Sequence, residues 1–357
     1  NGNSASVVSA NITILSLTFT AGYTNTVTIN TSVTLTIAGN FTDNTAHSWT
    51  VSGSGKITIS ATSTIASGGK TFPGPITFTG ANTKTLSGNW TITGTLTVSG
   101  TTTLNWTTAE TFSIAGINAS SNISGTAKII LKAGKWTSGT VQNNMDIAGN
   151  VTMGASAAYN TGTLTYLSGT VTTTGSTLTI SGSTTLNTNG ISWENVSLTT
   201  AATFTINSLL TVSGTLTFGT NTSTTLAGTS GFTCGTLTTA SSSATTITLV
   251  NNVTYIITTA FSCANSRTGA IVLFTSDHAA NTAALILGRG ATCNVLADFT
   301  RINATGGRPI ITFNGVLTTT TNIIIQTNVA VNPPKFSRKF GRRKSIYNRP
   351  LQVQYVS

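Results

Sequence analysis

The segment LTVSGTTTLN at residues 96–105 decides the fold, because it returns as LTISGSTTLN at residues 178–187 and as LTVSGTLTFG at residues 210–219. Looser copies are LTIAG at residues 35–39 and WTITG at residues 90–94. Each full copy reads as a short strand, a tight turn at glycine and a second short strand. Recurrence of one small β unit is typical of a stacked repeat protein, in which neighbouring units close each other's core.

Apolar residues alternate with threonine inside these units. Val33, Leu35 and Ile37, for example, occupy every second position. A period of two places one set of side chains inward and the other outward. Threonine suits the outer set, since its β-branch favours extended backbone and its hydroxyl is hydrated. No long stretch has an apolar period of 3.6 residues, so the sequence predicts an all-β chain.

The composition of the 357-residue chain narrows the class of protein. Threonine and serine together make up about a third of it, and charged residues make up only 6%. A helical bundle or coiled coil needs many charged helix formers, and the plentiful Val, Ile, Leu and Phe argue against disorder. The first residue is Asn1, which indicates a processed chain or part of a longer product. Low charge and high Thr favour a location on a virion, outside a cell or on its surface.

We therefore predict a right-handed parallel β-helix, or β-solenoid, with a basic, mostly extended C-terminal tail. Coils of about 20 to 30 residues would give roughly 11 to 16 coils. A β-sandwich array is the competing architecture, and the likeness of successive units favours the solenoid. Residues 1–259 are predicted to form a Thr-rich solenoid and residues 260–332 its terminal, more apolar coils, with Arg267, Arg289, Arg301 and Arg308 on turns. Residues 333–357 form a basic docking tail, in which the alternating residues 351–356 can add a last strand.

The three cysteines recur in a shared local pattern. They end the segments GFTC, AFSC and GATC at Cys234, Cys263 and Cys293, and the two intervals between them are almost equal. Residues at equivalent positions of successive coils stack on one another. We therefore predict a buried structural ladder of thiols, with a disulfide between neighbouring coils as the alternative.

The tail carries seven of the 17 basic residues, and the whole chain has a net charge of +11. Its candidate partner-binding residues are basic side chains with interleaved aromatic ones: Lys335, Phe336, Arg338, Lys339, Phe340, Arg342, Arg343, Lys344, Tyr347 and Arg349. Three interpretations stay open. The tail is a docking arm for an acidic partner surface, an attachment to nucleic acid or anionic lipid, or a solvated segment that keeps the rod soluble.

The sequence offers little catalytic chemistry. Asp277 and His278 are adjacent, which suits general base catalysis, but neighbours on a strand point to opposite faces, so a turn role is favoured. Glu110 with Asp146 or Glu194 is the pair that a solenoid glycosidase would need. The six acidic residues are too dispersed for a calcium site. We therefore predict no catalytic, metal or cofactor-binding residues and no membrane-spanning segment.

Tryptophan side chains can stack on sugar rings, but at β positions they more often fill the core or a corner. The five candidates are Trp49, Trp90, Trp106, Trp136 and Trp193. The core role is the interpretation that we favour for them.

The units GTLTVSG at residues 94–100 and ADFTRINATGG at residues 297–307 resemble Thr-rich β-solenoid segments of phage virion proteins, such as tail fibres, spikes and head fibres. Bacterial β-helical surface adhesins are similar in composition. The resemblance implies a non-enzymatic structural or adhesive role, usually in a trimer, with other virion or surface proteins and a host glycan as partners. A secreted adhesin or filament subunit is the alternative, and a glycan-cleaving tailspike is the second alternative. The basic tail is not a standard feature of either family.

Overall fold

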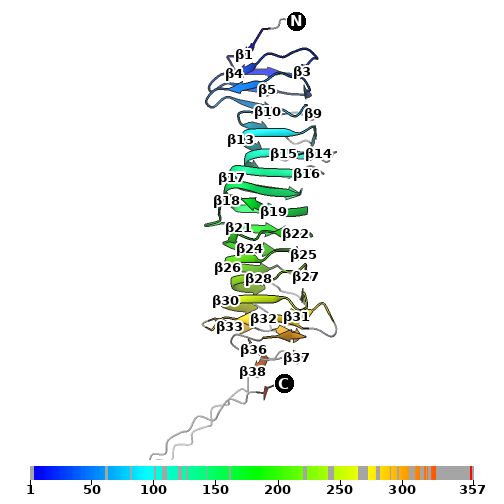
Figure 1. The fold of residues 1–357 in the computed structure, drawn as a ribbon, viewed down its shortest axis with the longest axis vertical. Helices are drawn as coiled ribbons and strands as arrows, with labels where there is room; N and C mark the ends of the chain where they lie inside the picture. The colour runs from blue at the N-terminus through cyan, green and yellow to red at the C-terminus, as the bar shows by residue number, and fades with distance from the viewer. Residues whose placement is uncertain are drawn as a thin grey trace, which may run out of the picture.

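In the computed structural model, the described residues form 39 strands that stack along one axis (Figure 1). It describes residues 4–60, 63–80, 83–99, 102–106, 111–119, 123–125, 128–142, 144–160, 162–219, 223–239, 245–263, 272–278, 282–289, 291–295, 297–304, 310–313, 317–318, 320, 323–326 and 354–355. No helix occurs within these ranges. The strand labels of Figure 1 run from β1 near one end of the stack to β38 near the other.

Short strands of two to five residues form the first coils because a turn residue soon interrupts each alternating run. These strands are β1 (Ser6–Val8), β2 (Ile12–Ile14), β3 (Leu17–Phe19), β4 (Val27–Ile29), β5 (Thr34–Ile37), β6 (Phe41–Asp43), β7 (Trp49–Val51), β8 (Lys56–Ile59), β9 (Ser63–Ser67), β10 (Thr71–Phe72), β11 (Ile76–Phe78) and β12 (Thr83–Ser87).

The longest strands, β17 and β18, lie in the middle of the chain, and shorter strands precede and follow them. The strands of this part are β13 (Trp90–Val98), β14 (Thr103–Trp106), β15 (Thr111–Ala119), β16 (Ile123–Gly125), β17 (Lys128–Gln142), β18 (Met145–Tyr159), β19 (Gly162–Ser168), β20 (Val171–Thr172), β21 (Thr177–Ile180), β22 (Thr184–Asn187), β23 (Ser192–Trp193), β24 (Asn195–Leu198) and β25 (Thr203–Ile206).

The remaining strands complete the stack. They are β26 (Leu210–Phe218), β27 (Thr224–Ala227), β28 (Phe232–Thr239), β29 (Thr245–Leu249), β30 (Thr254–Cys263), β31 (Val272–Ser276), β32 (Ala283–Leu287), β33 (Thr292–Val295), β34 (Ala297–Thr300), β35 (Ile302–Asn303), β36 (Ile310–Phe313), β37 (Leu317–Thr318), β38 (Ile323–Gln326) and β39 (Gln354–Tyr355). β30 runs across position 259/260, where the composition changes.

Parallel pairing of every third strand defines the coils at the N-terminal end. β1 pairs with β4 and β4 with β7, β2 pairs with β5 and β5 with β8, and β3 pairs with β6 and β6 with β9. Each coil here therefore has three strands, one on each face of the shaft. The pairings between described strands are parallel except for that of β38 with β39. These pairings confirm the predicted all-β parallel solenoid and its repeat character.

The register of these pairings turns the alternating sequence into columns of like residues. One inward column contains Ile12, Leu35, Ile57, Ile76, Leu96, Ile117, Trp136 and Met153. The outward column beside it contains Thr13, Thr36, Thr58, Thr77 and Thr97. From Leu35 onward the inward side chains are buried, so the aliphatic core is continuous along the shaft.

The glycine of the repeated unit lies in two different local structures. In the copy at residues 178–187, Gly182 lies in a bend between β21 and β22, and a Cβ there would lie 2.0 Å from the carbonyl oxygen of Asn160 in the preceding coil. In the copy at residues 210–219, however, Gly214 lies inside the continuous strand β26, where the register shifts between Val212 and Thr215. A Cβ at Gly214 would lie 2.6 Å from the carbonyl oxygen of Glu194, so the close approach of the preceding coil, and not a turn, requires glycine there.

Candidate functional site

The candidate partner-binding residues of the tail lie outside the described residues. These are Lys335, Phe336, Arg338, Lys339, Phe340, Arg342, Arg343, Lys344, Tyr347 and Arg349. Within residues 333–357, the structure describes only Gln354 and Tyr355, which form β39. β39 pairs antiparallel with β38 of the same chain, so this strand covers part of the last described coil.

The predicted cysteine ladder is wrong. Cys234 pairs in register with Ile257, Cys263 with Thr239 and Val295, and Cys293 with Phe261. The coils differ in length, so nearly equal intervals in the sequence do not bring the thiols to equivalent positions. All three are free thiols; Cys234 and Cys263 are buried and Cys293 is partly buried. Burial raises the pKa of Cys234 and of Cys263 to about 12, as expected for unreactive core thiols.

The acidic residues singled out in the sequence have structural partners. Asp277 accepts hydrogen bonds from the backbone N–H of Asn251 at 2.7 Å and from its Nδ2 at 3.0 Å, which joins two neighbouring coils at a turn. Glu194 accepts a hydrogen bond from the backbone N–H of Gly175. Asp146 pairs in register with Ile130 and Thr165, so no second carboxylate lies next to it along the sheet. Glu110 lies outside the described residues.

Tryptophan and arginine positions largely follow the prediction. Trp49, Trp90, Trp136 and Trp193 are buried, which confirms the core interpretation for these four; the side chain of Trp106 is not described. Arg289 and Arg301 lie in turns or bends, as predicted, and Arg267 and Arg308 are outside the described residues.

The sequence analysis missed a buried polar cluster between β6 and β7. Nδ1 of His47 lies 3.3 Å from Oδ1 of Asp43 and 2.8 Å from Oγ1 of Thr45. The other carboxylate oxygen of Asp43 accepts a hydrogen bond from Nε1 of Trp49 at 2.8 Å. Nζ of Lys70 donates to the backbone oxygen of His47 at 2.8 Å. The four-residue spacing of Asp43 and His47 in a loop between two strands was the signal that could have revealed the pair.

Aromatic rings seal this cluster. The ring centroid of His47 lies 4.0 Å from that of Phe19, 5.4 Å from that of Tyr23 and 5.5 Å from that of Trp49. The side chains of His47 and Asp43 are 0% and 2% exposed. An Asp–His pair can act as a general base when a substrate reaches the free imidazole nitrogen, but these rings leave no access for one.

Burial sets the charge state of the cluster. Burial raises the pKa of the Asp43 carboxyl, while the Trp49 hydrogen bond, the Lys70 charge and the backbone of Thr45 lower it. Burial, and then the charge of Lys70, lower the pKa of His47 to about 4. His47 is therefore neutral at neutral pH, and its buried Nε2 has no hydrogen-bond partner among the described residues.

A second buried charge lies deeper in the shaft. Lys84 in β12 is 0% exposed and occupies an inward position between Ser63 and Leu104. Burial lowers the pKa of its amine. The alternating pattern places position 84 on the inward face, although lysine is rarely fully buried.

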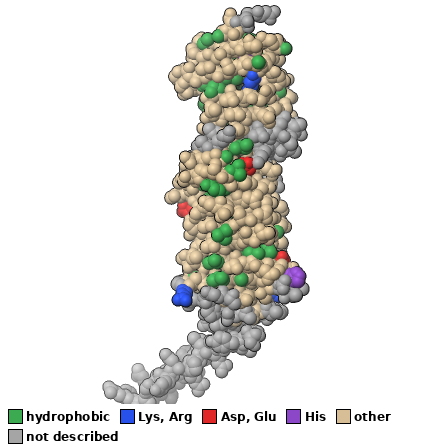
Figure 2. Space-filling view, in the orientation of Figure 1, with side chains coloured by type: hydrophobic (Ala, Val, Ile, Leu, Met, Phe, Trp, Pro, Cys, Tyr) green, Lys and Arg blue, Asp and Glu red, His purple; other side chains and the backbone are tan. Residues whose placement is uncertain are grey.

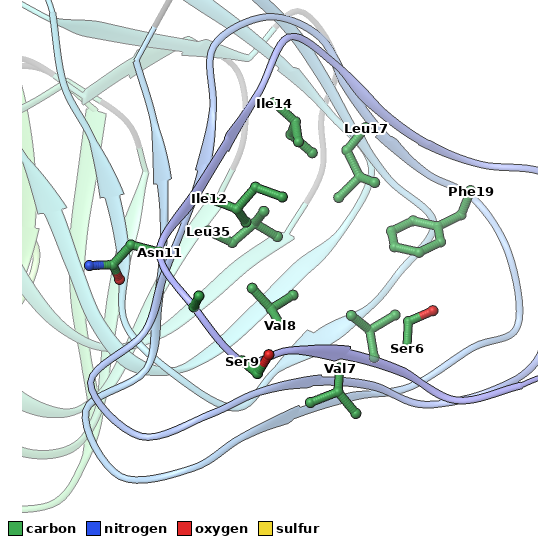
Figure 3. A pocket seen from close by; sticks show the side chains of 12 residues that line it. Ser6, Val7, Val8, Ser9, Asn11, Ile12, Ile14, Leu17, Phe19 and Leu35 are labelled. Carbon is green, nitrogen blue, oxygen red and sulfur yellow. The ribbon is translucent and has the colours of Figure 1, made fainter.

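The N-terminal end of the shaft contains an open apolar cavity of about 460 Å³. Figure 3 shows the side chains that converge on it from the first two coils: Val8, Ile12, Ile14, Leu17, Phe19 and Leu35. Phe19 thus lines the cavity and also contacts His47, so the polar cluster supports the cavity from one side.

The cavity exists because β1, β2 and β3 each have a partner strand on one side only among the described residues. Their inward side chains consequently lack the covering coil that later strands have. Val7, Ile12 and Leu15 are 58%, 47% and 83% exposed, the largest apolar exposures near this end. An apolar hollow therefore lies beneath the edge of the first described strands.

No protein-family model, curated protein or solved structure matches the chain. Within the described ranges, no three His, Cys, Asp or Glu side chains are grouped so that they could hold a metal ion. None of the described secondary structure is a helix of the length and hydropathy that crossing a membrane requires.

Proposed function

We propose that the chain is a non-enzymatic structural or adhesive shaft. The observation that supports this most directly is the parallel pairing of strands in successive coils, which surrounds one continuous hydrophobic core. Such a shaft is stiff because each coil is hydrogen bonded to the next and shares its core. It holds its two ends apart and presents a long hydroxyl-rich surface.

The surface is better suited to binding other molecules than to catalysis. Figure 2 shows a face on which charged side chains are few and scattered and apolar ones form small separate groups. The Asp43–His47 pair, which has the composition of a general base, is sealed. A depolymerase assay on host polysaccharide tests the glycan-cleaving alternative, and release of new sugar ends would overturn the proposal.

The biological setting that we propose is a virion fibre, spike or decoration component, with a secreted cell-surface adhesin or filament subunit as the alternative. We also propose right-handed coils, because parallel crossover connections are right-handed in nearly all proteins. Trimerisation and binding to a host glycan are part of the same proposal. Negative-stain electron microscopy of the purified chain should show straight rods, whereas compact lobes would contradict a shaft.

The basic tail is proposed to anchor the shaft to an acidic surface of a partner protein. Its seven basic residues within residues 335–349 supply the charge, and its aromatic residues supply contact area. A mobility-shift experiment with bare DNA separates this from nucleic-acid attachment. Salt-sensitive binding to DNA by the wild-type chain, lost in a Lys/Arg→Gln tail variant, would favour the nucleic-acid interpretation.

A further inference from the structure

One face of the shaft presents two rows of small, mostly polar side chains. Strands β21, β24, β26, β28 and β30 stack one on the next to form this face (Figure 1). Each strand turns two positions outward, one on either side of a buried residue such as Leu216 in β26 or Leu237 in β28. The first row is Thr177, Asn195, Thr215, Thr236 and Ala260, and the second row is Thr179, Ser197, Thr217, Thr238 and Ser262. We call these positions the hydroxyl grid.

The parallel register makes the hydroxyl grid a regular lattice. Neighbouring strands lie about 4.7–4.9 Å apart, and alternate residues of one strand lie about 6.4–6.8 Å apart. In the second row, Thr217 pairs with Thr238, so a hydroxyl and a methyl group recur from one coil to the next. Threonine is stiff at χ1, and each coil is hydrogen bonded to its neighbours, so the lattice is ordered before any partner binds.

The threonine hydroxyls of the grid do not hold the coils together. Those of Thr217 and Thr238 have no hydrogen-bond partner among the described residues. Threonines between the strands behave differently, because Oγ1 of Thr200 donates to the backbone oxygen of Ser181 at 2.7 Å. Each hydroxyl can donate one hydrogen bond and accept others, so the grid offers both functions to a molecule outside the chain.

The grid lacks the groups that bind the commoner partners. None of its side chains is charged, so it cannot neutralise the phosphates of a nucleic acid or the acidic groups of an anionic glycan. None is aromatic, so it has no platform on which a sugar ring or a base could stack. The partner that fits is uncharged, flat and periodic, and its surface both donates and accepts hydrogen bonds.

Crystalline water has these properties. Every molecule in an ice surface is a donor and an acceptor, and its oxygen atoms repeat at intervals close to the spacing of adjacent β-strands. We propose that the hydroxyl grid binds the surface of ice, with its hydroxyls hydrogen bonded to lattice water and its methyl groups packed between water molecules. This activity goes beyond the proposed shaft, because it depends only on the register of these strands.

The test uses the full chain and two matched double variants. Thr217→Lys with Thr238→Lys places two charges in the second row of the grid. Thr211→Lys with Thr233→Lys is the control, because these residues also pair with each other in β26 and β28 and are likewise partly exposed. Their row lies outside the grid and continues with Ile256 in the next coil. Circular dichroism checks that each variant retains its β-structure.

Slow freezing of a dilute solution measures binding as the fraction of protein that enters the growing ice, and light microscopy measures recrystallisation of small ice crystals. We expect the wild type and the control to enter the ice and to slow recrystallisation. The grid variant should enter the ice about fivefold less, because the strongly hydrated lysine ammonium disrupts the array. Thr217→Val with Thr238→Val, which keeps the side-chain shape and removes the hydroxyls, should also reduce the uptake.

Wild-type protein that growing ice excludes overturns the inference. Equal uptake of the wild type and both grid variants overturns it as well, because the ice would then bind elsewhere on the chain. Retention on insoluble cellulose or chitin that the lysine pair abolishes, without uptake by ice, would overturn it in favour of a neutral glycan. None of these results affects the proposed shaft, which the shape of the particles in electron micrographs tests independently.

Discussion

Trp49 donates its indole Nε1–H to Oδ2 of Asp43 over 2.8 Å, inside a shaft whose core is otherwise mainly aliphatic. The bond satisfies one oxygen of a buried carboxylate, and the other oxygen lies 3.3 Å from Nδ1 of His47. Because Phe19 of the first coil packs on His47 at a centroid distance of 4.0 Å, this corner ties the N-terminal coil to the one that follows.

Replacing Trp49 with Phe should destabilise the N-terminal coils by about 1.5–3 kcal/mol, because the buried carboxylate loses its donor. Urea unfolding with a matched Trp90→Phe control measures this. Nε1 of Trp90 donates to the neutral backbone oxygen of Ser87 at 3.3 Å, so its loss should have a smaller effect. Adding Asp43→Asn to Trp49→Phe should restore part of the loss. Equal losses for the two tryptophan variants would show that the Asp43 hydrogen bond contributes nothing specific.

Acid should weaken the fold through His47. Its pKa falls from 6.5 to about 4 on folding, so the unfolded chain binds more protons between these pH values. The free energy of unfolding should therefore decrease as the pH drops from about 6.5 to 4, by at most about 3 kcal/mol. Asp43 has a raised pKa, so the folded chain binds more protons there and its contribution opposes that of His47 at acidic pH.

Urea unfolding at several pH values checks the histidine prediction. His47→Phe should flatten the pH dependence between pH 4 and 6.5, and His278→Phe, a substitution outside the buried cluster, is the matched control. The same pH dependence in His47→Phe as in the wild type would refute the assignment.

Inward and outward neighbours in β13 should respond very differently to truncation. Leu96 is 0% exposed and lies in the central inward column, whereas Thr97 lies in the outward one. Leu96→Ala should lower the free energy of unfolding by about 2–5 kcal/mol through lost burial and a cavity, and Thr97→Ala by less than about 1 kcal/mol. Chemical denaturation of both variants measures the difference. A reversed order would contradict the register.

The three thiols should react in two classes. Burial raises the pKa of Cys234 and of Cys263 to about 12, so neither forms appreciable thiolate at pH 8. An aromatic disulfide reagent should label Cys293, which is partly buried, well before the other two, and all three in denaturant. The variant Cys293→Ser should lose the early phase. Rapid labelling of three thiols in the native chain would show that the core is not closed around them.

The period-two pattern was enough to predict the all-β class, and the recurrence of one β unit predicted the stacking of coils. Ile12 and Ile14 lie on one face of β2, as Leu35 and Ile37 do in β5, because an extended backbone sends every second side chain to the same face, whatever the rest of the chain does. The four described tryptophan side chains were assigned to the core for a related reason, since large rings at β positions fill corners.

The cysteines show where that reasoning stops. Equal spacing in sequence predicts stacking only if every coil has the same length. Between Cys234 and Cys293 the coils differ in length. The pairing partner of each residue depends on the turns in between, whose lengths a local motif does not reveal.

Local alternation is a property of the backbone, so strand formation, the inward set and the hydroxyl-rich exterior can be read from the residues alone. The register between coils depends on the summed lengths of the intervening loops. Only the tertiary structure shows this register, because no local sequence motif specifies it. The packing of Phe19 on the Asp43–His47–Trp49 corner and the open cavity that Phe19 lines both belong to the second kind. Each is created by side chains from different coils, and their environment changes with the register.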